Sequence, residues 1–74
     1  MRTIPRVEVF KTNVQEVEES IMIVGKLLEH FPNSAINFDL EDCDKILRVH
    51  GASISNPKII ELLNSYGFHC EALL

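Results

Sequence analysis

Hydrophobic and polar positions follow six regular segments along the chain. Four segments alternate between apolar and polar side chains, as strands buried on one face do: residues 6–11, 36–40, 45–50 and 68–73. Two segments place apolar side chains at steps of three and four, which predicts amphipathic helices: residues 17–31 and 59–66. The predicted order is strand, helix, strand, strand, helix, strand, and no linker or repeat interrupts it.

Short signals mark where the two helices begin and end. Asn13, followed three residues later by Glu16, has the form of a capping box and predicts the start of the first helix. This helix is expected to end at Phe31, because the residue before a proline is disfavoured in the α conformation. Ser55, with a proline two residues later, predicts the start of the second helix, and Gly67 predicts its end.

This order of elements predicts an α+β fold of the ferredoxin-like βαββαβ type, a two-layer sandwich. Two amphipathic helices bury their apolar stripes if they lie side by side on one face of an antiparallel four-stranded sheet. Right-handed crossovers then give the strand order 4-1-3-2. The chain is short enough for residues 1–74 to form a single domain.

The spacing also predicts which face of the first helix is buried. Its apolar residues fall at steps of four and three, so we expect one inner stripe, made of Val17, Ile21, Val24, Leu28 and Phe31. Met22 and Ile23 lie outside this stripe and are expected on the outer side of the helix. There they either widen a contact surface or are half-buried at the edge of the helix.

The open face of the sheet is the predicted contact surface. Val7 and Val9 are expected to face the helices, which turns the alternate side chains outward. The outward side chains are then Glu8, Phe10, Ile46, Arg48, His50, His69 and Glu71, with Phe10, Ile46, Arg48 and His50 as the interaction surface. An aromatic and a branched aliphatic side chain at its centre favour protein contact or self-association; the alternative is two scattered apolar surface residues.

Charge narrows the class of partner. Eleven acidic against seven basic side chains give a net charge of −4, whereas a nucleic-acid-binding protein needs a clustered positive surface. No run of eighteen apolar residues predicts membrane insertion, and the first residues lack the apolar core of a secretory signal, which favours a cytoplasmic location. Six carboxylates are expected near one end of the fold, where they dock a basic partner, attract hard cations weakly or are merely solvated: Glu16, Glu18, Glu19, Glu41, Asp42 and Asp44.

Several segments resemble the heavy-metal-associated domain family, the fold of cytosolic copper chaperones and of the N-terminal modules of metal-pumping ATPases. Residues 31–33, Phe-Pro-Asn, resemble the family's Leu-Pro-Gly helix exit. Residues 36–40 with the acidic turn after them resemble its second strand, and residues 45–49 its third. Residues 59–68 resemble the family's segment that ends in Ala-Gly-Tyr. The resemblance covers nearly the whole chain and implies the same fold.

The family's metal ligands are missing at the matching positions. The family binds metal through Met-x-Cys-x-x-Cys, and counting back from Pro32 places this pair near Val17 and Ser20. Neither side chain is a ligand for the soft metals that thiolates select. The resemblance therefore implies the fold without the metal activity, and we expect no cofactor.

Two cysteines leave one alternative open. They are too few for a disulfide framework, but Cys43 in the acidic turn and Cys70 near the start of the last strand are expected at the same end of the sheet. There they would form a non-standard site for Cu(I) or Zn(II). Burial of Cys70 on the apolar side of its strand argues against such a site. If the strand slips by one residue, His69 and Glu71 turn inward and Cys70 turns outward.

Catalytic motifs are missing from the sequence. The glycines stand singly, and there is no nucleophile elbow and no His-Glu-x-x-His motif. His50 with Glu71 or Glu8 is the acid–base pair that the open sheet face offers, and an exposed pair of this kind is usually a surface contact. The sequence therefore predicts a non-catalytic binding or regulatory module that acts by protein contact or self-association, with soft-metal binding through thiols as the alternative.

Overall fold

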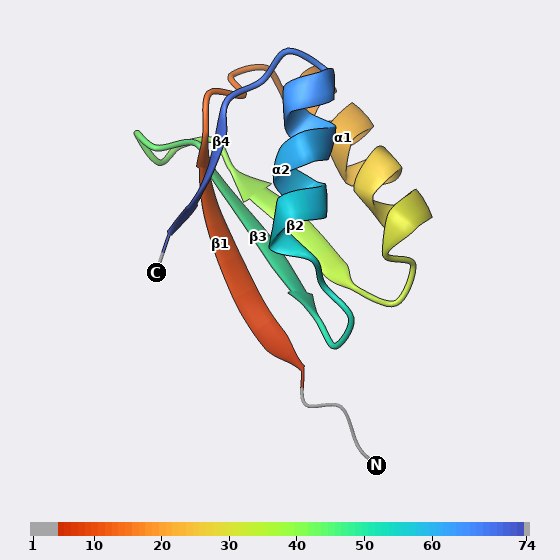
Figure 1. Cartoon of the computed structure of the whole chain (residues 1–74). Helices are drawn as coiled ribbons and strands as arrows, with labels where there is room; N and C mark the ends of the chain where they lie inside the picture. Colours follow the sequence, from red (N-terminus) through yellow and green to blue (C-terminus); the bar gives the residue numbers. More distant parts are fainter. Residues whose placement is uncertain (1–4, 74) are drawn as a thin grey trace.

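The computed structural model describes residues 5–73 and contains the predicted elements in the predicted order (Figure 1). They are β1 (Arg6–Thr12), α1 (Val17–His30), β2 (Ala35–Asp39), β3 (Ile46–Gly51), α2 (Asn56–Ser65) and β4 (Cys70–Leu73). One antiparallel sheet has the strand order β2-β3-β1-β4, and both helices cover the same face of it (Figure 1). The α+β fold, its ferredoxin-like layout and its strand order are thereby confirmed.

The predicted ends of α2 are confirmed. Ser55 is the N-cap residue, and its hydroxyl accepts a hydrogen bond from the Lys58 backbone N–H at 3.4 Å. Gly67 follows the helix with a φ of 89°, which glycine adopts without steric cost. The Phe68 backbone N–H still donates to the Leu63 carbonyl at 3.0 Å, so β4 begins later than predicted, at Cys70.

The start of α1 differs from the prediction. Glu16 is the N-cap residue and forms the capping box with Glu19, so the predicted cap at Asn13 is wrong. The chain first carries Val14 into the core, where it is fully buried, and this delays the helix. The Asn13 Oδ1 instead accepts a hydrogen bond from the His69 backbone N–H at 2.8 Å, which ties this loop to the chain that enters β4.

β1 turns the opposite face to the helices from the one predicted. Phe10 is fully buried beside its partner Leu47, whereas Val7 is 57% exposed. Side-chain size explains the difference, because burying a phenylalanine removes more apolar surface from water than burying a valine. Glu8 shares the helix-facing side with Phe10, and its carboxylate accepts a hydrogen bond from Asn56 Nδ2 at 2.8 Å.

α1 buries a different stripe from the one predicted. Ser20, Ile23 and Leu27 are buried, whereas Val17 and Ile21 are 61% and 66% exposed. Apolar positions cover an arc of roughly 160° on this helix at 100° per residue, and the sheet and α2 cover only one side of it. Steps of three and four fit both sides of the arc, so the spacing alone does not select the buried one.

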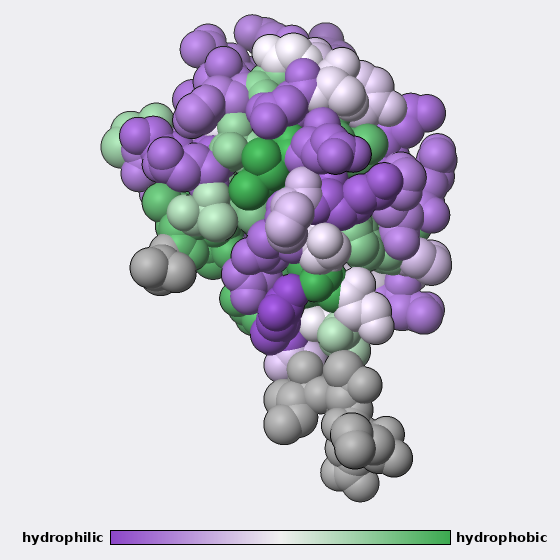
Figure 2. All heavy atoms as spheres, viewed as in Figure 1, coloured by the Kyte–Doolittle hydropathy of each residue, from purple (hydrophilic) through white to green (hydrophobic). Residues whose placement is uncertain are grey.

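The core lies between the sheet and the two helices (Figure 1). Its fully buried side chains are Phe10, Val14, Ile23, Leu27, Leu47, Val49, Ile59 and Leu63. Of the predicted inner stripe of α2, Ile59 and Leu63 are buried, Leu62 packs at the edge of the core and Tyr66 is half-exposed. On the face seen in Figure 2, apolar patches lie among more extensive polar areas. Within residues 5–73, neither helix has the length and apolar content to cross a membrane.

A candidate docking groove between the first helix and the edge strand

The apolar stripe predicted to be the inner side of α1 faces solvent. Val17 and Ile21 are well exposed, Leu28 is 37% exposed, and Val24 is half-buried between them. The four side chains follow one another at steps of four, three and four, which aligns them along the helix. Met22 is exposed as predicted, but Ile23, expected beside it, lies in the core.

This stripe forms one wall of a groove against β2. β2 is an edge strand, and in the described part of the chain it pairs with β3 alone. Phe38 and Leu40 come from β2 and the residue after it, pack against the core and form the opposite wall. The groove has a volume of about 470 Å³ and is lined by Val17, Ser20, Ile21, Val24, Phe38, Leu40 and Glu41.

The rim of the groove is acidic. Glu18 lies next to the apolar stripe on α1, and Glu41 lines the groove from the hairpin loop; both are exposed. The ion pairs among residues 5–73 are Arg6–Glu8, Lys11–Asp44 and Lys26–Glu29, and none of them involves Glu18 or Glu41. The groove therefore combines apolar walls with one carboxylate in its lining, Glu41, and a second, Glu18, on the outer flank of α1; neither has an ion-pair partner in the described part of the chain.

The interaction surface predicted on the open sheet face is not formed as expected. Phe10 is fully buried and Ile46 is 6% exposed, so neither offers an apolar contact to a partner. Arg48 and His50 are exposed, as predicted. The structure pairs them with Val9 and Val7 of β1, so Val7 is the exposed apolar side chain next to His50.

Neither of the acid–base pairs considered for His50 is formed among the described residues. Glu8 lies on the helix-facing side of β1 and its carboxylate is bonded to Asn56, so it does not share the open face with His50. Glu71 is exposed on β4, where it pairs with Lys11 in the register of the sheet. The geometry therefore gives no catalytic pair on this face among the described residues.

The two cysteines have different surroundings. Cys70 faces the helices as predicted, 6% exposed, and burial raises the pKa of its thiol to about 12. Cys43 is exposed in the hairpin loop, where its sulfur and carboxylate oxygens of Asp42 and Asp44 lie within 4.8 Å of one another. Cys70 does not belong to this cluster. Among the described residues, the group of three possible ligands thus contains Cys43 and not Cys70.

Part of the acidic cluster predicted at one end of the fold has a structural role in the hairpin loop between β2 and β3. The Thr12 backbone N–H donates to the Asp44 carbonyl at 3.1 Å, and Lys11 Nζ lies 3.8 Å from Asp44 Oδ1. These contacts hold the loop beside the end of β1, from which the chain leads to α1. Asp42 Oδ1 accepts the Asp44 backbone N–H at 2.8 Å, so part of this charge stabilises the loop itself.

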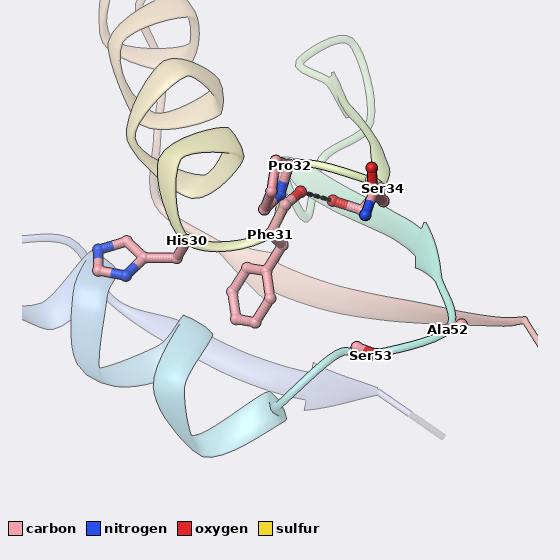
Figure 3. Close-up of a pocket in the computed structure, with 7 residues that line it drawn as sticks. His30, Phe31, Pro32, Ser34, Ala52 and Ser53 are labelled. Carbon is pink, nitrogen blue, oxygen red and sulfur yellow. Dashed lines mark hydrogen bonds between the residues drawn. The ribbon is translucent and has the colours of Figure 1, made fainter. Parts of the chain in front are cut away.

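A second, smaller hollow lies where α1 ends. It has a volume of about 190 Å³ and is lined by residues 30–34 and 52–53. The ring of Phe31 points into it, and the Ser34 hydroxyl donates to the Phe31 carbonyl at 2.5 Å (Figure 3). The hydroxyl is thus occupied by the turn, and the volume is below that of ordinary small-molecule sites.

No protein-family model, curated protein or solved structure matches the chain.

Sequence reasoning found the apolar residues of the groove on α1 but assigned them to the buried side of the helix. The signal for the groove was the width of the apolar arc on α1, which includes Ile23 and Leu27 as well as the predicted stripe. When the apolar arc of a helix is wider than the side that packs against the core, the remaining apolar side chains are exposed to solvent. The width of the arc therefore predicts a second, exposed apolar stripe, but it does not tell which of the two stripes is buried.

Proposed function

We propose that this chain is a small non-catalytic binding module that acts by protein contact through the α1–β2 groove. The observation that carries the proposal is the exposure of Val17 and Ile21, 61% and 66%, beside Phe38 and Leu40. Aligned apolar side chains on a surface rimmed by charged residues are typical of protein interaction sites. In this proposal the fold, which resembles that of heavy-metal-associated domains, holds the groove in place, and the groove binds the partner.

Protein contact is better supported than soft-metal binding through thiols. A Cu(I) or Zn(II) site needs thiolates, because the thiolate is the ligand. The buried thiol of Cys70, with a pKa raised to about 12, opposes ionisation at neutral pH. Cys43 alone, with two carboxylates beside it, makes a poor ligand set for a soft metal.

Site-specific photocrosslinking tests the proposal. A photoreactive amino acid replaces Ile21 in the groove or, as the matched control, Val7 on the open sheet face; both side chains are mainly exposed. In cells that make the protein, we expect position 21 to give a discrete adduct heavier than the chain itself, and position 7 to give none. The adduct should disappear in the Leu28→Lys variant, because this change places a charge in the same apolar stripe.

Two outcomes would contradict the proposal. Equal crosslinking from both positions would mean that the adducts reflect collision and not docking. An adduct from position 7 alone would move the contact surface to the open sheet face, where Arg48 and His50 are exposed.

A further inference from the structure

We infer that the α1–β2 groove binds a cationic amphipathic helix of a partner protein. The inference rests on the proposed function and adds the shape and charge of the occupant. Two observations carry it, the spacing of the exposed apolar side chains and the carboxylates at the groove that have no ion-pair partner among residues 5–73. A glycine on the flank of the same stripe is consistent with it.

The spacing of the exposed stripe fits a helix. Val17, Ile21, Val24 and Leu28 form a ridge along α1 with the repeat of three and four residues by which helices pack against one another. Phe38 and Leu40 close the groove on the side of β2. A helix laid along α1 would place its own apolar residues between this ridge and the wall, as in helix-in-groove recognition.

Gly25 lies on the flank of the same stripe. It follows Ile21 by four residues and precedes Leu28 by three, so it shares their side of the helix. A Cβ atom added at this position would meet nothing within 4 Å, and no contact with the rest of residues 5–73 therefore requires a glycine. Glycine in the interior of a helix is destabilising relative to alanine, and its known use is to let another backbone approach closely. Gly25 is outside the lining of the groove, on the flank of the stripe away from β2, so it leaves room for a helix that reaches across the ridge of α1.

The charge of the rim selects a cationic partner. Glu18 flanks the stripe on α1, and Glu41 lines the groove from the other side. The hairpin segment, residues 39–45, carries four acidic residues and one lysine, whose Nζ is held by the Leu40 carbonyl at 2.9 Å. A second copy of this chain would bring the same carboxylates against them. A helix with lysine or arginine beside its apolar stripe would pair with them instead.

Peptide titrations test the inference on the full chain. The probes are three fluorescent peptides of about eighteen residues, five helical turns. The first has a leucine stripe flanked by lysines, the second has the same stripe flanked by glutamates, and the third has the composition of the first in scrambled order. We expect the first alone to bind, and the amide signals of residues 17–28 and 38–41 to shift in its presence.

Matched variants locate the contact and separate its two components. Ile21→Ser should weaken binding of the lysine peptide by about tenfold or more, as truncation of an anchor side chain does, while Val7→Ser leaves it unchanged. Glu18→Gln with Glu41→Gln should weaken it a few-fold, and the loss should shrink as salt screens the charges. Glu71→Gln, on the other face, is the charge control.

Three other results would overturn the inference, and each identifies the part of it that is wrong. Equal binding of the glutamate peptide would refute the charge argument, and equal binding of the scrambled peptide would refute the helical one. A dimer that Ile21→Ser dissociates would make a second copy the occupant. In each of these cases photocrosslinking from position 21 would still report a groove contact, whereas failure of the proposed function would abolish that crosslink and every peptide response.

Discussion

Ile21 and Ile23 are two residues apart on α1, yet one is 66% exposed and the other is fully buried. The sequence predicts the reverse, because Ile21 continues the longer run of regular steps. Both choices satisfy a helical repeat, and only packing against the sheet and α2, which are formed by other parts of the chain, decides between them. The burial of individual side chains on a helix with a wide apolar arc is therefore beyond what spacing alone can predict.

Alanine substitution separates the two isoleucines by their effect on stability. We expect Ile23→Ala to lower the free energy of unfolding by about 2–5 kcal/mol, since it leaves a cavity in the core. Ile21→Ala should change it by less than about 0.5 kcal/mol, as exposed substitutions do. Urea denaturation followed by circular dichroism measures both values. A larger loss for Ile21→Ala would mean that α1 buries the stripe first predicted.

Thiol reactivity distinguishes the two cysteines in the same way. The pKa of the Cys70 thiol is raised to about 12 by burial, so the reactive thiolate is scarce near pH 8 in the folded chain. We expect one thiol, Cys43, to react quickly with iodoacetamide and Cys70 to react only on unfolding. Mass spectrometry of the alkylated peptides identifies each site. Rapid labelling of Cys70 in native protein would contradict its burial.

The same shift predicts how stability depends on pH. The pKa of Cys70 is higher in the folded chain than its ordinary value of 9.0, so the unfolded chain releases this proton first. The stabilising contribution is therefore complete below pH 9 and is lost as the pH rises toward 12. We expect the wild-type chain to lose stability over this range more steeply than Cys70→Ala, in paired urea titrations. Identical pH profiles would remove Cys70 as the cause.

At the scale of elements, the ends of a helix were predictable where residues at that end determine them. Ser55 caps α2 and Gly67 ends it, because both act through their own backbone geometry. The start of α1 and the face of β1 were not predictable in this way. The first depends on drawing Val14 into the core, and the second on burying Phe10 opposite Leu47, and both partners lie elsewhere in the chain.

Alanine substitution is expected to change the stability of the chain in opposite directions at Gly25 and at Gly67. Gly25→Ala should stabilise the chain by about 0.5–1 kcal/mol, because alanine has less conformational entropy to lose on folding and the new Cβ meets no described atom within 4 Å. Gly67→Ala should destabilise it by about 1 kcal/mol, because the residue keeps a φ of 89°. Thermal denaturation of both variants checks the signs. Destabilisation by Gly25→Ala would mean that α1 itself needs the glycine.

At the scale of the whole molecule, topology was predictable and the site was not. Right-handed crossovers and two amphipathic helices leave the order β2-β3-β1-β4 as the natural arrangement, whichever residues face inward. The groove depends on which apolar stripe remains after the core has formed. The predicted surface at Phe10 and Ile46 failed for this reason, because it depended on which face of β1 turns outward. The charge argument against a nucleic-acid partner does not depend on the register.

Because the chain has a net charge of −4, salt should affect the binding of two occupants of the groove in opposite directions. The two occupants are a second copy of the chain and a cationic helix. Two copies that meet through Val17 and Ile21 repel each other through Glu18 and Glu41, and salt screens this repulsion as the Debye length falls from about 30 Å at 0.01 M to about 3 Å at 1 M. A cationic helix is attracted by the same carboxylates, and salt weakens that attraction. We therefore expect sedimentation velocity to give a monomer at low salt, with any self-association growing as salt rises and lost in Ile21→Lys. Binding of the lysine peptide should fall over the same range. A dimer that is strongest at low salt would mean that opposite charges meet across its interface, and the acidic groove would then not be the surface that joins the two copies.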